Sequence, residues 1–259
     1  MTDAHNHLQQ LAEPVKALSL AKENGVTRML VNGTSEADWK QVEQLAQAHS
    51  EVIPSYGLHP WHVPERTSDW LKTLRRFLEK ESTAALGECG LDRWKKPFDL
   101  AEQIDCLQAQ LDLANELHRP LTIHCLQAWG PLLETLQRQP SLPPFLLHAY
   151  SGSTELVAKF TQLGAYFSFN GYFLHNRKTA VRDTFQQIPL DRLLLETDAP
   201  AMRPPIEFQT CPLPNEQNHP GNLTGFLTPL AKLLGIDTKE LSNQIQNNFD
   251  NFYQTTATE

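Results

Sequence analysis

The chain has 259 residues, of which 40% are hydrophobic, and its formal net charge is −8 at pH 7. A chain of this length can bury one large core, which fits a single α/β barrel domain. The acidic balance argues against a protein that coats nucleic acid nonspecifically, although it allows a local basic surface. We expect no contact with a membrane, because no apolar run approaches the roughly 18 residues of a membrane span.

The cysteine pattern favours free thiols, because the four cysteines include no C-x-x-C pair. Together with the absence of a charged-then-apolar leader segment, it predicts a cytoplasmic protein. Cys89 and Cys125 each follow a candidate ligand, so strand alternation directs them toward the helices as core residues. Nothing in the sequence indicates an oligomeric state.

Short apolar segments alternate with amphipathic ones along the chain. The apolar segments predict strands at 2–8, 28–33, 52–58, 84–88, 120–124, 145–148, 165–169 and 192–198. Apolar residues at helical spacing predict helices at 38–48, 69–79, 100–117, 156–163 and 237–249. A further helix is expected after residue 222, where Pro229 must either kink the helix or begin it.

Eight strands that alternate with helices predict parallel pairing through right-handed crossovers and closure into a (β/α)8 TIM-type barrel. The alternative is an open doubly wound sheet, but no glycine-rich dinucleotide fingerprint follows the first strand. We assign residues 1–254 to one barrel domain and 255–259 to a flexible tail.

Ligand-type side chains recur where the predicted strands end. His5 and His7 alternate onto one face of the first strand, and the others are Glu88, His124, His148 and Asp198. Taken singly, each is more often a buried core residue or a turn former. In a barrel, however, the C-terminal strand ends converge on one site, and six such residues there indicate a metal centre.

Four imidazoles and two carboxylates exceed the needs of one tetrahedral ion, which favours two divalent ions. We expect Glu88 to bridge them, His5 and His7 to hold one ion, and His124 and His148 to hold the other. Asp198 would complete the coordination of the first ion and accept a proton from the attacking water. The metal lowers the pKa of that water. Imidazole-rich ligation suits Zn²⁺ or Mn²⁺ better than Mg²⁺.

The motifs around these residues resemble those of the TatD-type metal-dependent deoxyribonucleases of the amidohydrolase superfamily. The resemblance covers nearly the whole chain and rests on His5-Asn-His7, Gly57-Leu-His59-Pro60, Gly87-Glu-Cys-Gly-Leu-Asp92, Ile123-His124, His148-Ala-Tyr-Ser-Gly-Ser153 and Leu195-Glu-Thr-Asp-Ala-Pro200. It implies a TIM-type barrel, DNA phosphodiester hydrolysis, Mg²⁺ dependence, and metal ligation by the six residues above. Glu88, where many superfamily relatives carry a carboxylated lysine, favours the TatD type.

Two positions depart from the family pattern, and both concern phosphate recognition. Leu126 stands where the family often has an arginine, and Gln217-Asn-His-Pro220 stands where Arg-Asn-Glu-Pro is common.

We therefore predict a dinuclear metal-dependent phosphodiesterase that acts on single-stranded DNA or DNA ends through a metal-bound hydroxide, with Asp198 and Glu88 as its catalytic residues. The net charge of −8 and Leu126 leave open a hydrolase of a small ester, lactone or amide. A non-catalytic metal-binding scaffold is a third alternative, and the intact ligand set speaks against it.

Candidate substrate contacts lie in the segments beyond the predicted strand ends. Arg93 is the expected substitute for the arginine missing at Leu126, and Trp94 and Tyr150 could stack on bases, as could Trp129 and Tyr172. A solvated surface or helix packing is the alternative for each. The candidates are His59, Arg93, Trp94, Tyr150, Arg177 and Arg203, within a basic collar that also includes His62, Arg66, Lys95, Lys96 and Lys178.

Overall fold

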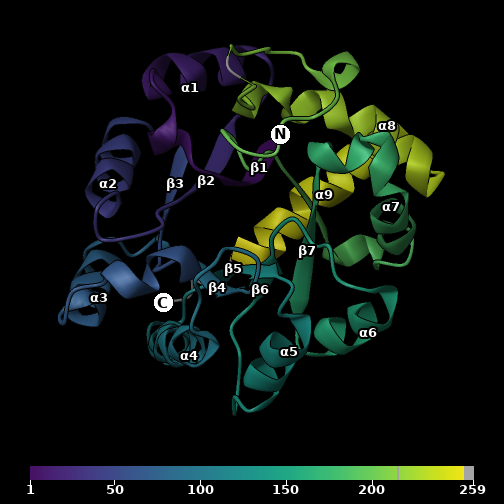
Figure 1. Ribbon diagram of the computed structural model, residues 1–259. Helices are drawn as coiled ribbons and strands as arrows, with labels where there is room; N and C mark the ends of the chain where they lie inside the picture. The colour runs from purple at the N-terminus through teal and green to yellow at the C-terminus, as the bar shows by residue number, and fades with distance from the viewer. Residues whose placement is uncertain (215, 254–259) are drawn as a thin grey trace.

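The computed structural model describes residues 1–214 and 216–253, so the predicted tail at 255–259 lies outside the described residues. Its eight strands pair in parallel in the order β1 to β8 (Figure 1). They are β1 (Thr2–Asn6), β2 (Arg28–Asn32), β3 (Val52–Tyr56), β4 (Ala85–Asp92), β5 (Leu121–Leu126), β6 (Phe145–Leu147), β7 (Ala165–Asn170) and β8 (Leu193–Glu196).

The segment after β8 returns to β1 and closes the ring. The Asp198 amide donates to the His5 carbonyl at 2.9 Å, and the His7 amide donates to the Ala199 carbonyl at 2.7 Å. The predicted (β/α)8 barrel is therefore confirmed, and the open doubly wound sheet is excluded.

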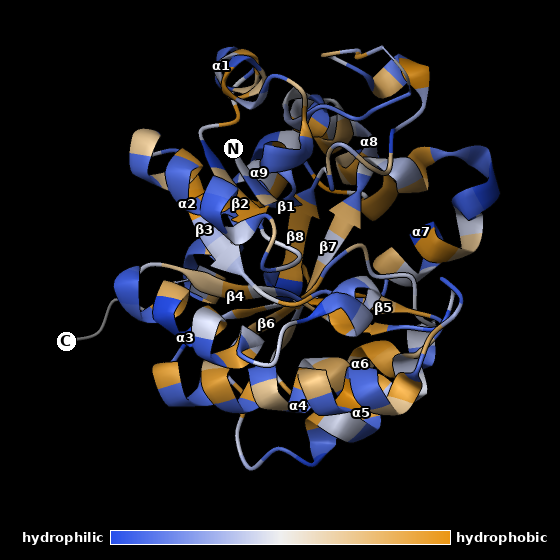
Figure 2. Ribbon diagram, turned by 60° about the vertical axis from the view of Figure 1, so that its left-hand side comes forward, coloured by the Kyte–Doolittle hydropathy of each residue, from blue (hydrophilic) through white to orange (hydrophobic). Residues whose placement is uncertain are grey.

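The helices surround the barrel and alternate between hydrophobic and hydrophilic bands, as amphipathic helices should (Figure 2). They are α1 (Pro14–Glu23), α2 (Trp39–Ala48), α3 (Trp70–Lys80), α4 (Leu100–Leu117), α5 (Trp129–Gln137), α6 (Thr154–Gln162), α7 (Thr179–Phe185), α8 (Thr224–Leu234) and α9 (Thr238–Tyr253). Within the described residues, no helix is long and apolar enough to cross a membrane. All four cysteines are free, as predicted, and all are buried, which confirms the core positions predicted for Cys89 and Cys125.

The sequence patterns did not predict three helices, each for a local reason. In α1, Val15 and Leu20 face solvent, which blurs the apolar stripe. Gly130 and Pro131 lie in the first turn of α5, and α7 has only 7 residues. Strand β4 also runs four residues beyond its predicted end at 88, to Asp92.

Helix α9 closes the N-terminal end of the barrel. Its buried Phe249 and Phe252 pack in one apolar cluster with interior side chains of six strands: Ala4, Leu30, Ala85, Leu146, Tyr166 and Leu194. These strand residues precede the polar side chains at the strand ends, and α9 crosses the middle of the ring in Figure 1. Functional groups can therefore face solvent only at the C-terminal end of the barrel.

Strand β1 is irregular between Asp3 and Asn6, where its pairing with β2 shifts register. Ala4 packs in the interior cluster with α9, yet its neighbour His5 also points into the barrel, toward its C-terminal end. Regular alternation would send these two residues to opposite faces, so the irregularity re-aims His5.

Candidate metal centre

The six predicted ligands converge above the interior apolar cluster. His5 and His7 come from the end of β1, Glu88 from β4 and His124 from β5. His148 directly follows β6 and Asp198 lies two residues beyond β8, at the same end of the barrel. Five of the six are buried and His124 is partly exposed, so the donor atoms are held by packed surroundings.

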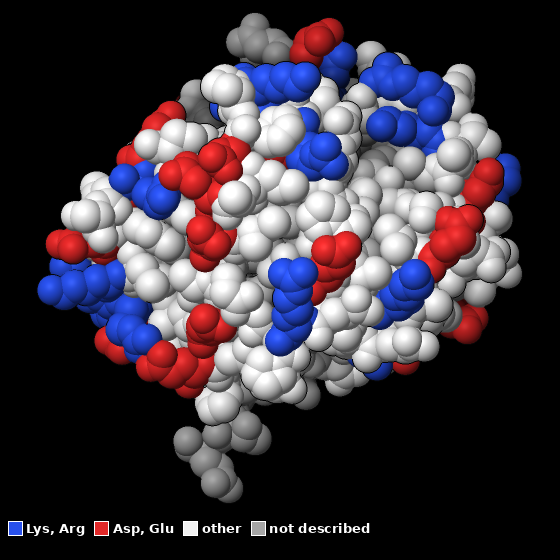
Figure 3. All heavy atoms as spheres, turned by 60° about the horizontal axis from the view of Figure 1, so that its bottom comes forward, with Lys and Arg blue, Asp and Glu red and all other residues white. Residues whose placement is uncertain are grey.

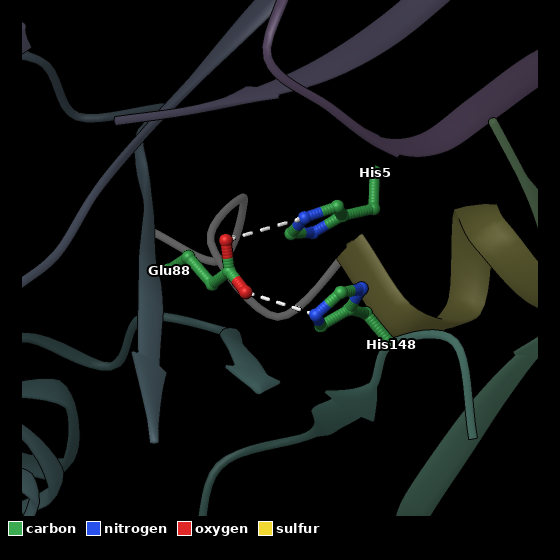
Figure 4. A group of neighbouring side chains, drawn as sticks. All are labelled: His5, Glu88 and His148. Carbon is green, nitrogen blue, oxygen red and sulfur yellow. Dashed lines mark ion pairs between the residues drawn. The ribbon is translucent and has the colours of Figure 1, made fainter. Parts of the chain in front are cut away.

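The Glu88 carboxylate lies between two groups of histidines. Its Oε2 is 3.1 Å from His7 Nε2 and 3.5 Å from His5 Nε2, whereas its Oε1 is 2.9 Å from His148 Nε2. Figure 4 shows the two oxygens pointing toward different imidazoles. One carboxylate can therefore serve two ions, with one oxygen for each.

The first group combines His5, His7 and Asp198. The two Nε2 atoms are 3.3 Å apart, and Asp198 Oδ1 lies 3.6 Å from His5 Nε2 and 3.4 Å from His7 Nε2. Metal–ligand bonds of ~2.0–2.1 Å in a tetrahedron separate the ligand atoms by about 3.3 Å. The spacing of these donors is therefore that of ligands around one ion.

The second group combines His124 and His148 with the other oxygen of Glu88. His124 Nδ1 lies 3.1 Å from Glu88 Oε1 and 3.1 Å from His148 Nε2. His124 thus offers Nδ1, whereas the other three histidines offer Nε2.

Outer hydrogen bonds orient two of the four imidazoles. His7 Nδ1 meets the Asn32 carbonyl at 2.8 Å, and His124 Nε2 meets Asp92 Oδ2 at 3.0 Å. Such partners fix the tautomer and aim the other nitrogen at a metal. His5 Nδ1 and His148 Nδ1 are buried with no hydrogen-bond partner among the described residues, and Glu196 Oε1 lies 3.5 Å from His148 Nδ1.

Sequence reasoning missed Asp92 and Glu196, although both belong to the recognised motifs. Asp92 closes the Gly-Leu-Asp run, and Glu196 stands two residues before Asp198. Glu196 also accepts hydrogen bonds from Ser168 and Asn170 of β7.

The electrostatics favour ionised carboxylates. Burial alone would raise the pKa of Glu88, but the surrounding histidines hold it well below its usual range. Burial would likewise raise the pKa of Asp198, and its hydrogen bond with His7 holds it low. In turn, Asp198 and Glu88 overcome burial and raise the pKa of His7 to about 10. The pocket is thus set up to stabilise positive charge among its carboxylates.

His59 lies close to the second group, but its Nε2 is a hydrogen-bond donor rather than a metal ligand. Its Nε2 lies 3.5 Å from Glu88 Oε1, and its Nδ1 accepts a hydrogen bond from the Trp61 amide at 3.0 Å. Burial lowers the pKa of His59 well below its usual value, so the ring is neutral. A neutral ring that accepts at Nδ1 carries its proton on Nε2, which therefore faces the site as an N–H.

A cavity of about 620 Å³ opens above the cluster. Its lining combines donor residues, aromatic rings and apolar side chains, and includes His59, Trp61, His62, Trp94, Leu126, Tyr172, Phe173, Lys178 and Met202.

Comparison with known proteins places this geometry in a family. The sequence matches the family described as TatD-related DNase over residues 2–254. The chain belongs to this family. It is 35% identical over 236 residues to a protein of Pantoea ananatis named 3′-5′ ssDNA/RNA exonuclease TatD, covering 90% of each chain. A protein of the same name from Erwinia billingiae is 32% identical over 240 residues, covering 92% of this chain and 91% of its own.

The fold agrees with solved structures of the family. A TatD homologue from Escherichia coli superposes with a TM-score of 0.91 at 26% identity and covers 98% of both chains. A TatD-family hydrolase from Entamoeba histolytica superposes with a TM-score of 0.87 at 19% identity, covering 98% of this chain and 97% of its own. This TatD-family protein is thus a hydrolase on a (β/α)8 barrel.

The candidate substrate contacts separate into two sets. His59 and Trp94 line the cavity, whereas Arg93, Arg177 and Arg203 do not belong to its lining. Arg93 is exposed, Arg177 donates to the Tyr172 hydroxyl and Arg203 pairs with Glu216. Among the collar residues, His59, His62 and Lys178 line the cavity.

The expected base contact of Tyr150 is wrong. The side chain is fully buried and packs against Trp129, Phe160 and Phe167. Its hydroxyl donates to the Ser153 carbonyl at 2.8 Å. The tyrosine follows a strand end but turns into the helical layer, which strand position alone could not reveal.

The two departures from the family pattern have different structural settings. Leu126 lines the cavity, so the missing arginine leaves an apolar patch there. The segment 217–220 instead supports the Asp198 loop. Asn218 is buried, and its side-chain Nδ2 donates to the Thr197 carbonyl at 2.8 Å. Its backbone amide donates to the Pro200 carbonyl at 2.9 Å.

Proposed function

We propose that this protein is a metal-dependent nuclease that removes nucleotides from the end of single-stranded DNA or RNA. The observation that carries this proposal is the Glu88 carboxylate, whose two oxygens face two separate ligand groups beneath an open cavity. Relatives at 35% and 32% identity are named 3′-5′ ssDNA/RNA exonucleases, which supports a 3′ polarity.

The residues present fit two divalent ions. The Nε2 atoms of His5 and His7 lie 3.3 Å apart, and ionised carboxylates complete each group. His5, His7 and Asp198 would hold one ion, His124 and His148 the other, and Glu88 both. The four imidazoles favour Zn²⁺ or Mn²⁺ over Mg²⁺. When bound, the ions would lower the pKa of coordinated water and offset the charge of the phosphate.

The side chains of this chain would divide the remaining work. Asp198, ionised and beside His7, accepts the proton released by the attacking water. The His59 Nε2–H donates to a phosphate oxygen near the second group. Lys178, which lines the cavity, supplies the cation that Leu126 lacks and that Arg93 is too remote to give.

An alternative is the hydrolysis of a small ester, lactone or amide. The observation in its favour is the apolar lining of Leu126, Phe173 and Met202, which would suit an uncharged substrate. The same ligands would serve this chemistry, so substrate choice alone separates the two functions.

A panel assay tests the proposal. Protein loaded in turn with Zn²⁺, Mn²⁺ or Mg²⁺ is given single-stranded DNA, single-stranded RNA, bis(p-nitrophenyl) phosphate and a lactone. We expect cleavage of the single strands to mononucleotides, with Asp198→Asn losing turnover while it keeps most of its metal. Lactone hydrolysis without any phosphodiester cleavage would establish the alternative instead.

We extend the proposal to the whole segment 1–254 as one hydrolase domain that works in the cytoplasm. The four free, buried thiols support a reducing compartment.

A further inference from the structure

Two exposed tryptophans stand at the mouth of the cavity. Trp61, on the 3-10 helix η2 (Pro60–Glu65), is 37% exposed, and Trp94, just beyond β4, is 58% exposed. Their ring centroids are 6.4 Å apart with an angle of 32° between the ring planes. Large aromatic side chains left open beside a polar site are a common sign of a binding surface.

The Asp92 carboxylate, which is fully buried, holds the Trp61 side chain and the Trp94 backbone. Its Oδ2 accepts the Trp61 indole N–H at 2.9 Å, and its Oδ1 accepts the Trp94 amide at 2.6 Å. The same Oδ2 lies 3.0 Å from Nε2 of His124. One carboxylate therefore ties the orientation of the Trp61 ring to that of a candidate metal ligand.

The two faces of Trp61 have different neighbours. Lys95 Nζ lies 4.4 Å from the ring centroid, and both residues line a second cavity of about 200 Å³. Lys95 does not belong to the lining of the large cavity, whereas Trp61 and Trp94 do. Trp61 thus borders both cavities, and its ring centroid lies 5.1 Å from that of His59 and 6.4 Å from that of His124.

We infer that Trp61, supported by Trp94, is a stacking platform for the base of a nucleotide next to the cleaved phosphate. The inference rests on the proposed nuclease function and names how its substrate is held. A fixed, exposed ring accepts any base on its π-face, so the platform would act without sequence preference. The ammonium of Lys95, 4.4 Å from the ring centroid, adds a cation–π contact that helps to hold the ring in place.

Base-dependent binding provides the first test, and it needs no turnover. Metal-loaded protein is titrated with short phosphorothioate-linked oligonucleotides that carry an abasic residue at one of the last three 3′ positions. For the wild type we expect one position at which the missing base weakens binding roughly 5- to 150-fold, the range measured for stacked bases. Trp61→Ala should bind the intact strand more weakly by a similar factor and lose this position dependence.

Two further variants separate stacking from a general disturbance. Trp61→Phe keeps an aromatic ring but loses the N–H bound by Asp92, so it should retain much of the position dependence. Ile206→Ala changes a side chain that is 82% exposed and not part of the cavity lining, so it should behave as the wild type. Metal content is measured for every variant.

The outcomes distinguish this inference from the proposed function. If the wild type binds abasic and intact strands equally, or Trp61→Ala keeps the position dependence, the stacking platform is disproved even if DNA is cleaved. If binding depends on the base but no metal-loaded protein cleaves any phosphodiester, the nuclease proposal fails and the platform stands.

Discussion

Glu88 occupies the centre of the site because the four candidate ligand histidines reach it from the ends of three strands. Its two oxygens face different groups, so its loss affects both, whereas each histidine serves one. Burial makes this arrangement demanding, since a carboxylate in a packed interior needs opposite charge or hydrogen bonds on every side.

Glu88→Gln should therefore lower metal stoichiometry in both groups, while His124→Ala should lower it mainly in one. We expect the glutamine variant to lose at least tenfold more activity than His124→Ala when both are assayed at the same metal concentration. Elemental analysis of the purified proteins measures the stoichiometry. A Glu88→Gln variant with two bound ions and near-normal turnover would refute the bridging role.

His219 gives the protein a pH-dependent stability at residue level. The ring is buried, its Nδ1 accepts the Gly221 amide at 2.9 Å, and burial lowers its pKa to about 4. The unfolded chain binds a proton near pH 6.5, so stability is lost as pH falls from about 6.5 to 4, by up to roughly 3 kcal/mol. His219→Asn, whose side-chain oxygen can also accept from Gly221, should flatten this slope in urea unfolding curves between pH 4 and 7. Parallel slopes would show that other groups dominate.

At the scale of elements, strands and amphipathic helices were predictable because each segment carries its own periodicity. The convergence of the six candidate ligands was also predictable, since a residue's place at a strand end follows from the strand. Asp92 was missed because β4 runs four residues past its apolar part, through Gly90. Tyr150 was misplaced because its direction is set by Trp129 and Phe160, which lie far from it in sequence. Contacts between elements leave no local pattern.

Helix α9 is the element whose packing matters most for barrel stability. Phe249 is fully buried among interior side chains of the strands. Phe249→Ala should lower the free energy of unfolding by about 3–5 kcal/mol, because it leaves a cavity in the packed end of the barrel. Val15→Ala, at a half-exposed position of α1, is the control and should change it by about 0.5 kcal/mol or less. Urea denaturation of metal-loaded proteins measures both values, and equal effects would contradict the role assigned to α9.

For the whole molecule, a net charge of −8 must be reconciled with a polyanionic substrate. Cations and anions are interspersed on the face shown in Figure 3, with no continuous basic surface there. Lys178 is a cation of the cavity lining, and Lys95 lies just behind Trp61. With these few cations near the cavity, the protein should contact few phosphates of a bound strand.

Cleavage of single-stranded DNA should therefore depend only weakly on salt. Each phosphate contact adds a slope of roughly 0.7 to the plot of log kcat/KM against log salt concentration. Lys178→Ala should reduce the slope by about that amount, whereas Lys159→Ala, on the exposed side of α6, should leave it unchanged. Rates measured from 50 to 300 mM salt give both slopes. A steep slope, or one that Lys178→Ala does not alter, would place phosphate recognition elsewhere.

The closed N-terminal end of the barrel also determines how substrate enters the site and how product leaves it. Because Phe249 and Phe252 fill that end, the described residues leave no passage along the barrel axis, and the cavity above the ligand cluster opens at the C-terminal end. A nucleotide cut from a strand must leave through the opening by which the strand came in, and the shortened strand cannot advance until it has gone. Product release and strand movement are therefore strictly alternating events in such a nuclease, and free mononucleotide should compete with the strand for the same space.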